Sequence, residues 1–117
     1  MANAVDDFLQ QIRERVANKW YQISVHAEEE RENESITLAQ IGETVQSGEI
    51  LEDYPEDRRG HSCLILGFTT SGQAIHSVWT ILTDGRARLI TVYLPQPPKW
   101  IDPRSRGKKA TNENKKE

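Results

Sequence analysis

Four side chains in this sequence are the best suited to chemistry: His26, Arg31, His76 and Tyr93. Histidine can give or take a proton near neutral pH, arginine can stabilise an anionic phosphate, and tyrosine can donate a hydrogen bond or stack on a base. Metal-independent RNA cleavage needs a base for the 2′-hydroxyl, an acid for the leaving 5′-oxygen and a cation beside the phosphate. These residue types therefore permit RNA cleavage, although composition alone does not select them.

Each candidate also has a structural explanation. His26 stands at the start of a predicted helix, where it either serves an anion site or packs between helix and sheet. His76 lies in a predicted strand on the face of Val78, and a buried, hydrogen-bonded histidine is favoured if that face is the core. Tyr93 is expected to share a strand face with Leu89, which favours a half-buried core residue.

Further basic side chains are candidates for binding an RNA backbone: Arg58, Arg59, Arg86 and Arg88. The first two lie in the charged turn PEDRRG, where Glu56 and Asp57 cancel much of their field. His61 directly follows this turn and is expected in an exposed loop. Cys63 stands in an apolar run and is expected to be a small core residue.

The sequence carries no signature of a cofactor. Three histidines and one cysteine, without CxxC spacing, give no structural zinc site. The glutamates between residues 28 and 34 point in several directions around a helix, which indicates a solvated face. GETVQSG and GFTTSG lack the lysine or glycine spacing of phosphate-binding loops. We therefore expect no metal and no nucleotide cofactor.

The length of 117 residues suits one domain. No apolar run approaches the roughly 18 residues of a bilayer-spanning helix, and the acidic amino terminus differs from a basic secretory signal. A cytoplasmic protein without membrane contact is therefore expected. Residues 99–117 carry seven Lys or Arg against three acids, whereas the rest of the chain is net acidic. The polar stretch 104–117 is expected to form a disordered basic tail.

Apolar spacing predicts helices first and strands afterwards. A helix over residues 4–20 would bury one stripe, formed by Val5, Phe8, Leu9, Ile12, Val16 and Trp20. Ser24 caps a second helix through HAEEERENE, and Thr37 with Gln40 forms a capping box for a third that ends at Gly48. The strands ILEDY, HSCLILGF, AIHSVWTIL and RARLITVYL follow. This order predicts an α+β fold with N-terminal helices packed on a mostly antiparallel meander sheet of about four strands.

Several short motifs, in this order, resemble one family. They are the HA pair at His26 before a charged helix, then GEILEDYPEDRRGHSCLILG, the strand IHSVW and the ending ITVYLPQPPKW. From Ser24 to Trp100 the chain resembles the domain of unknown function 4258, and the pattern TVY-x-P-x-P-x-x-W at Thr91–Trp100 is the most specific part. This region predicts a domain over residues 23–103, preceded by a separate helix within residues 1–22.

The resemblance implies a RelE-like fold and a RelE-like or MqsR-like toxin of a bacterial toxin–antitoxin pair. Such a toxin would cleave RNA and pair with a zinc-ribbon antitoxin of the YgiT type. Family members commonly carry arginines four and eight residues beyond the histidine of the HA pair, where this chain has Glu30 and Glu34. This replacement favours an alternative, a non-catalytic protein-binding module of the same fold.

Overall fold

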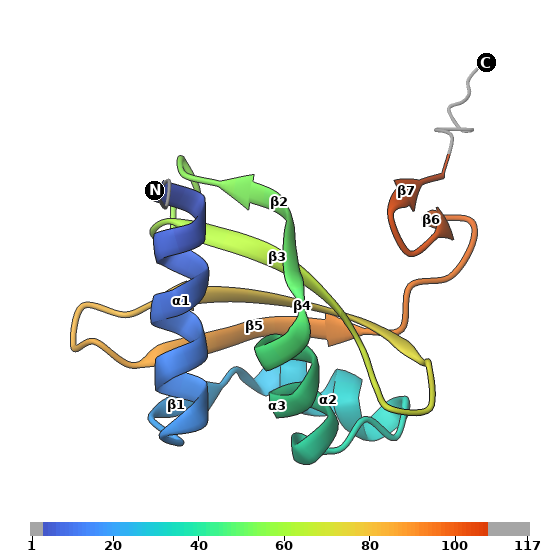
Figure 1. The fold of residues 1–117 in the computed structure, drawn as a ribbon, viewed down its shortest axis with the longest axis horizontal. Helices are drawn as coiled ribbons and strands as arrows, with labels where there is room; N and C mark the ends of the chain where they lie inside the picture. The colour runs from blue at the N-terminus through green and yellow to red at the C-terminus, as the bar shows by residue number, and fades with distance from the viewer. Residues whose placement is uncertain (1–3, 108–117) are drawn as a thin grey trace.

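Helices lie on both sides of a five-stranded sheet in the structure, a computed structural model that describes residues 4–107 (Figure 1). The helices are α1 (Ala4–Ala17), α2 (Val25–Asn33) and α3 (Leu38–Ser47). The sheet has the spatial order β1-β5-β4-β3-β2 and contains β1 (Tyr21–Ile23), β2 (Glu49–Tyr54), β3 (Ser62–Phe68), β4 (Ala74–Ile81) and β5 (Ala87–Tyr93). A separate hairpin follows, made of β6 (Trp100–Asp102) and β7 (Ser105–Arg106).

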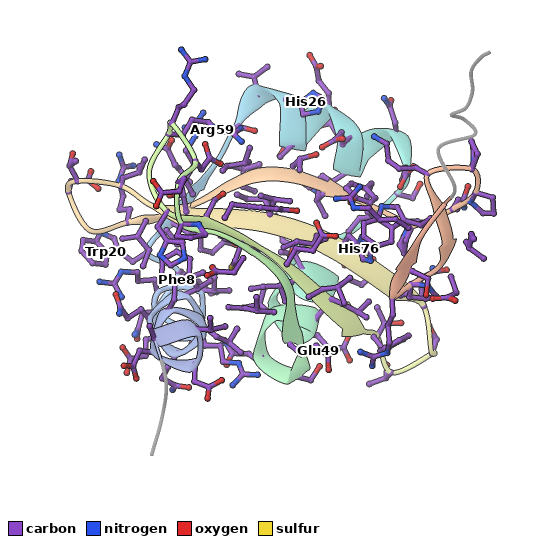
Figure 2. All side chains as sticks on the ribbon, turned by 90° about the horizontal axis from the view of Figure 1, so that it is seen from above. Phe8, Trp20, His26, Glu49, Arg59 and His76 are labelled. Atoms are coloured by element: carbon purple, nitrogen blue, oxygen red, sulfur yellow. The ribbon has the colours of Figure 1, made fainter. Side chains whose placement is uncertain are left out.

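One face of the sheet, the core face, is covered by α1 and α3, and Figure 2 shows α2 on the opposite side. Four residues of α1 at helical spacing are buried in this core: Phe8, Leu9, Ile12 and Val16. The strands add buried side chains that include Cys63, Ile65, Ile75, Trp79 and Leu89. Arg13 ties α1 to α3, because its guanidinium donates to the carbonyl oxygens of Val45 (3.1 Å) and Gly48 (2.6 Å).

The first helix ends three residues before the predicted residue 20. Lys19 has a left-handed φ of 59°, and the amides of Lys19 and Trp20 donate to the carbonyls of Val16 (3.0 Å) and Arg15 (2.8 Å). These two bonds form a Schellman motif, which terminates a helix. Trp20, predicted on the buried stripe, is consequently 47% exposed. The prediction fails because a lysine occupies the position where glycine usually marks a helix end.

The other two predicted helices are confirmed together with their caps. The Ser24 hydroxyl accepts a hydrogen bond from the Ala27 amide at 2.9 Å at the start of α2. Thr37 and Gln40 form the predicted capping box of α3, and Gly48 ends that helix. Both helices therefore begin where short polar side chains replace missing helical hydrogen-bond partners.

The predicted α+β class is confirmed, with the four predicted strands present as β2 to β5. The sheet nevertheless has five strands rather than about four, and its helices do not all precede it. The additional strand, β1, lies between α1 and α2 and pairs in parallel with β5, with Tyr21 opposite Ala87 and Ile23 opposite Leu89. Three residues are too few to show a strand period, so the pattern of the sequence does not reveal β1.

Two β-bulges decide which side chains reach the second face of the sheet, the face away from α1 and α3. One extra residue, Ile90, lies between Leu89, which pairs with Trp79, and Thr91, which pairs with Val78. Leu89 therefore points into the core while Tyr93, paired with His76, points to the second face. The prediction that Tyr93 shares a face with Leu89 is wrong, because a bulge reverses the alternation.

The carboxyl-terminal part of the described chain folds back on the sheet. Trp100 in β6 pairs with Arg106 in β7, so the first residues of the segment predicted as a disordered tail form a strand. Residues 108–117, the remainder of that tail, lie outside the described residues. No helix within residues 4–107 is both long and apolar enough to cross a bilayer.

Candidate functional site

Polar and aromatic side chains meet on the second face of the sheet. They come from β2, β4 and β5 of the sheet and from the β6–β7 hairpin. We call this group the Tyr93 cluster and define it as Glu52, Tyr54, His76, Tyr93, Trp100 and Arg106. A bulge at Leu51 brings Glu52 to this face, where it lies opposite Leu64. The bulge at Ile90 likewise brings Tyr93 to this face, where it lies opposite His76. Two of the four predicted catalytic residues, His76 and Tyr93, thus meet in one cluster.

His76 is fully buried, and both ring nitrogens have partners. Nε2 lies 2.8 Å from the Pro103 carbonyl oxygen and Nδ1 lies 3.1 Å from the Tyr93 hydroxyl. A carbonyl oxygen can only accept, so Nε2 carries the hydrogen of the neutral imidazole and Nδ1 is the acceptor. The Tyr93 hydroxyl therefore donates its proton toward His76.

Burial keeps both members of this pair neutral at pH 7. Removal from water lowers the pKa of His76 from its usual 6.5, despite opposing contributions from the Pro103 carbonyl and Glu52. Burial also raises the pKa of Tyr93 above its usual 10, while Trp100 and Arg106 partly offset the increase. In this arrangement the neutral imidazole can accept the proton of the Tyr93 hydroxyl, while the Tyr93 oxygen accepts a proton from a bound molecule.

Trp100 closes the cluster on one side. Its indole ring meets the His76 ring edge-on, with centroids 4.4 Å apart. The indole N–H lies close enough to Tyr93 to lower the pKa of that phenol, yet within residues 4–107 it is the one buried side-chain polar atom without a hydrogen bond. Leaving such a donor unsatisfied costs about 1–3 kcal/mol. An oxygen atom bound beside the Tyr93 hydroxyl would remove this cost.

Arg106 supplies the positive charge of the cluster. Its guanidinium lies 4.6 Å from the Trp100 ring centroid and donates two hydrogen bonds to the Glu52 carboxylate, at 2.9 and 2.7 Å. The bonds from Arg106 lower the pKa of Glu52, and burial raises the pKa of Tyr54 to about 12. About half of the Arg106 side chain remains exposed, so the cation can also meet a ligand from solvent.

The helix α2 borders the cluster and carries His26. This histidine is exposed, and its Nε2 lies 3.2 Å from Glu30 Oε2. The other oxygen of Glu30 accepts from the Val92 amide at 2.9 Å and from the Thr91 hydroxyl. Glu30 also contributes to the raised pKa of Tyr93. A single carboxylate therefore lies near both His26 and Tyr93.

The two glutamates at positions where the family commonly has arginine have a clear structural role. After Ile23 of β1 no strand of the described chain pairs with this edge of the sheet, so the amides of Val92 in β5 and of Leu94 just after it have no strand partner. Glu30 accepts a hydrogen bond from the Val92 amide, and Glu34 accepts one from the Leu94 amide at 2.7 Å. One helical turn separates the two carboxylates, and this spacing follows alternate amides of the strand. Glu30 and Glu34 thus fasten α2 to an otherwise open sheet edge.

We expect Glu30→Ala to lower the free energy of unfolding by about 1–3 kcal/mol, because a half-buried amide and a hydroxyl lose a charged acceptor. Glu29→Ala is the matched control on the exposed side of the same helix, with an expected change within about 0.5 kcal/mol. Urea denaturation followed by circular dichroism measures both. Equal stability of the two variants would contradict the fastening role of Glu30.

Arg31 and the predicted RNA-binding arginines lie outside the Tyr93 cluster. Arg31 binds both oxygens of Glu28 at 2.9 Å and the Ile36 carbonyl at 3.2 Å, so it secures the end of α2. Three of the others lie in the β2–β3 loop and the β4–β5 turn: exposed Arg58, Arg59 paired with Asp57, and Arg86 paired with Asp84. Arg88 lies in β5 and donates to the side chain of Gln22 in β1. Arg106 was missed as a site residue, because it lies in the predicted tail.

Two other predictions concern β3 and the turn before it. His61 is partly buried rather than loop-exposed, since its ring stacks on Phe8 with centroids 3.9 Å apart and Nε2 lies 2.5 Å from Asp53. Cys63 is confirmed as a buried core residue, and burial raises the pKa of its thiol to about 12. Such a thiol is a poor nucleophile.

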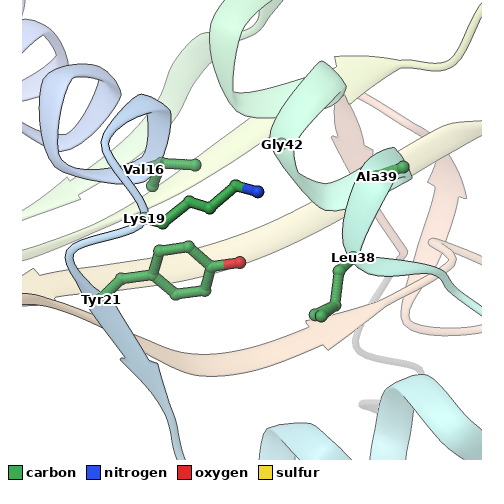
Figure 3. Close-up of a pocket in the computed structure, with 6 residues that line it drawn as sticks. All are labelled: Val16, Lys19, Tyr21, Leu38, Ala39 and Gly42. Carbon is green, nitrogen blue, oxygen red and sulfur yellow. The ribbon is translucent and has the colours of Figure 1, made fainter.

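A separate groove of about 390 Å³ lies between α1, β1 and α3 (Figure 3). It contains none of the predicted site residues and is lined by Val16, Lys19, Tyr21, Leu38, Ala39 and Gly42. In the part of the chain that the structure describes, no three His, Cys, Asp or Glu side chains are grouped to hold a metal ion. Among the described residues, the Tyr93 cluster is therefore the strongest candidate for a catalytic site.

His76 makes stability depend on pH. Its pKa is lower in the folded protein than the usual 6.5, so between these values the unfolded chain binds more protons. Stability therefore falls as pH is lowered from 7 to 5. We expect this loss to be smaller in His76→Gln, which has no imidazole to titrate, when urea unfolding is compared at the two pH values. Identical losses in parent and variant would contradict a buried neutral His76.

Comparison with known proteins gives one match. A family model described as a domain of unknown function (DUF4258) matches residues 23–94, which include α2, α3 and strands β2 to β5. No curated protein and no solved structure matches the chain. Since the match covers more than half of the 117 residues, the chain belongs to the DUF4258 family.

Proposed function

We propose that this protein is a metal-independent endoribonuclease whose reacting site is the Tyr93 cluster. The observation that carries the proposal is the hydrogen bond between the half-buried Tyr93 hydroxyl and the neutral, buried His76. The indole N–H of Trp100, which has no hydrogen bond, and the half-exposed Arg106 are near enough to Tyr93 to lower the pKa of its phenol. A proton acceptor, a donor for a phosphate oxygen and a cation are thus adjacent, as phosphodiester cleavage requires.

In the proposed reaction, the RNA 2′-oxygen attacks the neighbouring phosphorus. Its proton passes to the Tyr93 oxygen while the Tyr93 proton passes to His76 Nδ1. As the new bond to phosphorus forms, the bond from phosphorus to the 5′-oxygen breaks, and His26, as the general acid, gives that oxygen a proton. Arg106 stabilises the charge on the phosphate. The products are a 2′,3′-cyclic phosphate and a 5′-hydroxyl.

The biological role proposed with this activity is that of a toxin in a bacterial toxin–antitoxin pair. A RelE-like fold, a cytoplasmic location and a zinc-ribbon antitoxin partner belong to the same proposal. It is supported by membership in the DUF4258 family and by a small mixed α+β domain with its polar cluster on one sheet face. Arg31 has no catalytic part in it, because it lies outside the Tyr93 cluster and holds the end of α2 through Glu28 and Ile36.

The proposal is tested by incubating the purified protein with a long single-stranded RNA in the presence of EDTA. We expect cleavage by the parent and by His61→Ala, a matched control outside the cluster, and loss of cleavage in His26→Ala and His76→Ala. Circular dichroism must show that each inactive variant is folded. Intact RNA at high parent concentration, or full activity of both variants, would contradict the proposal.

A second candidate function is a non-catalytic protein-binding module. It is favoured by the replacement of two common family arginines with Glu30 and Glu34, which hold α2 instead of a phosphate. Pairing of Arg59 and Arg86 with acids also weakens the attraction for a polyanion. Intact RNA together with stable binding of a protein partner would favour this candidate over the nuclease.

A further inference from the structure

Lys19 has a backbone conformation that glycine adopts more readily than lysine. Its φ of 59° lies in the left-handed region, where the Cβ atom of a side chain crowds the backbone. A glycine at this position would end α1 with the same hydrogen bonds at a lower conformational cost. Side chains held in such strained positions cluster at ligand sites. The lysine side chain itself is therefore the feature that needs an explanation.

The described protein makes no polar contact with the Lys19 side chain. Its ammonium group has neither an ion-pair nor a hydrogen-bond partner among residues 4–107. Glu43, an acidic residue of α3, is engaged elsewhere, since its Oε2 accepts from the Thr70 amide at 3.1 Å. Figure 3 shows the Lys19 side chain extending from the end of α1 toward α3. Lys19 thus brings an unpaired cation to the groove between α1, β1 and α3.

This groove of about 390 Å³ is apolar apart from Lys19. The ring of Tyr21 is fixed by an edge-on contact with Trp79, with centroids 5.8 Å apart. Gly42 leaves space in the groove, because an added methyl group there would meet nothing within 4 Å. Small-molecule sites have volumes of roughly 300–1,000 Å³ and combine apolar walls with a few polar groups. The groove meets both conditions.

The size of the apolar surface favours a small molecule over a protein partner. Specific protein interfaces bury about 800 Å² on each partner, around an apolar core. Leu38 is the one large, exposed hydrophobic side chain that lines the groove. The other such side chains within residues 4–107 lie outside its lining: Trp20, Val25, Phe68 and Ile101. A compact apolar molecule can nevertheless fill the space between α1 and α3.

Lys19 determines the charge of the ligand. It is the one charged residue among the six that line the groove, and none of the six is acidic. A single ammonium group matches a single negative charge. A phosphate monoester carries a charge of about −1.5 to −2 and three acceptor oxygens, more than one lysine can satisfy. A carboxylate carries one negative charge and therefore fits Lys19 better.

We propose that the groove binds a small monocarboxylate with an apolar body. Its carboxylate pairs with Lys19, and its apolar body contacts Tyr21, Leu38 and Gly42. The groove lies beside α1 and α3, the helices that cover the core face, whereas the Tyr93 cluster lies on the second face (Figure 2). The inference is thus independent of the proposed nuclease activity.

Binding is measured by titrating the full chain, isotope-labelled for NMR, with sodium octanoate, an apolar chain that ends in one carboxylate. We expect saturable shifts of the Ala39 and Gly42 amide signals, because both residues line the groove. Octylammonium chloride has the same apolar chain with the opposite charge. It should bind more weakly than octanoate by at least about threefold.

Variants separate the charge from the apolar walls. Lys19→Met keeps the apolar stem and removes the charge, so it should weaken octanoate binding about 3- to 10-fold without weakening that of octylammonium. Lys99→Met is the matched control, since Lys99 is also exposed but lies outside the groove, and it should bind octanoate like the parent. Gly42→Leu should lose binding because its side chain would fill the groove, and circular dichroism must show that it is folded.

Lys19→Gly separates a ligand-binding role from a structural one. Glycine adopts the left-handed conformation at lower cost, so this variant should unfold at a higher urea concentration than the parent. It should nevertheless bind octanoate as weakly as Lys19→Met. The inference would be overturned by the absence of saturable shifts with octanoate, by equal binding of octanoate and octylammonium, or by equal octanoate binding in parent and Lys19→Met. Lower stability of Lys19→Gly would also overturn it, because the lysine would then serve the fold.

Discussion

Tyr93→Phe is expected to lower the rate of RNA cleavage by about 10²- to 10⁴-fold, the usual contribution of a positioned proton-transfer group. The variant keeps the aromatic ring that packs 5.2 Å from His76 and loses only the hydroxyl that donates to Nδ1. Loss of this hydroxyl leaves the buried Nδ1 of His76 without its partner and should lower the free energy of unfolding by about 1–3 kcal/mol. The rate constant at saturating RNA is the quantity to compare.

The control for this substitution is Tyr21→Phe. Tyr21 is also a half-buried tyrosine in the sheet, but it lies on β1 and packs edge-on against Trp79, with centroids 5.8 Å apart. We expect it to cleave RNA at the parent rate. A Tyr93→Phe protein as active as Tyr21→Phe would show that the Tyr93 hydroxyl takes no part in proton transfer.

Gly67→Ala is expected to destabilise the fold by about 1–3 kcal/mol through overpacking. Gly67 lies in β3 directly beneath α3, where an added methyl group would lie 2.6 Å from Thr44 Cβ and closer still to the Thr44 carbonyl oxygen. The backbone of α3 must therefore move, and with it the helix packing that buries Val45. Chemical denaturation measures the loss of stability.

Gly42→Ala provides a comparison of opposite sign. Gly42 lies within α3 beside the groove of Figure 3, and an added methyl group there meets nothing within 4 Å. Alanine in a helix interior is more stable than glycine by about 0.5–1 kcal/mol, so this variant should gain stability. If Gly67→Ala were as stable as Gly42→Ala, the close approach of α3 to β3 would be incorrect.

Local signals account for the elements that the sequence predicts correctly. The capping box at Thr37 and the Ser24 cap each act over four residues or fewer, so they can be recognised without the rest of the fold. The end of α1 and the strand β1 could not be predicted. Lys19 adopts the left-handed conformation without the glycine signal, and β1 depends on pairing with β5, far along the chain.

The candidate site is less visible in the sequence than the fold. His76 and Tyr93 could be singled out by residue type, but their contact depends on the bulge at Ile90, which no local pattern marks. Glu52 and Arg106 are 54 residues apart in the sequence. The one sequence feature that indicates their ion pair is the opposite charge of the acidic segment β2 and the basic end of the chain. Glu30 could be noticed as an unusual residue, whereas its bond to Val92 required the fold.

The most direct test of the nuclease proposal is identification of the RNA ends that the protein produces. The parent is incubated with EDTA and two substrates of equal sequence, one ordinary RNA and one with 2′-O-methyl groups throughout. We expect 2′,3′-cyclic phosphate and 5′-hydroxyl ends from the ordinary RNA and no cleavage of the methylated strand. Cleavage of the methylated strand, or 5′-phosphate ends, would contradict attack by the 2′-hydroxyl and with it the role assigned to Tyr93 and His76.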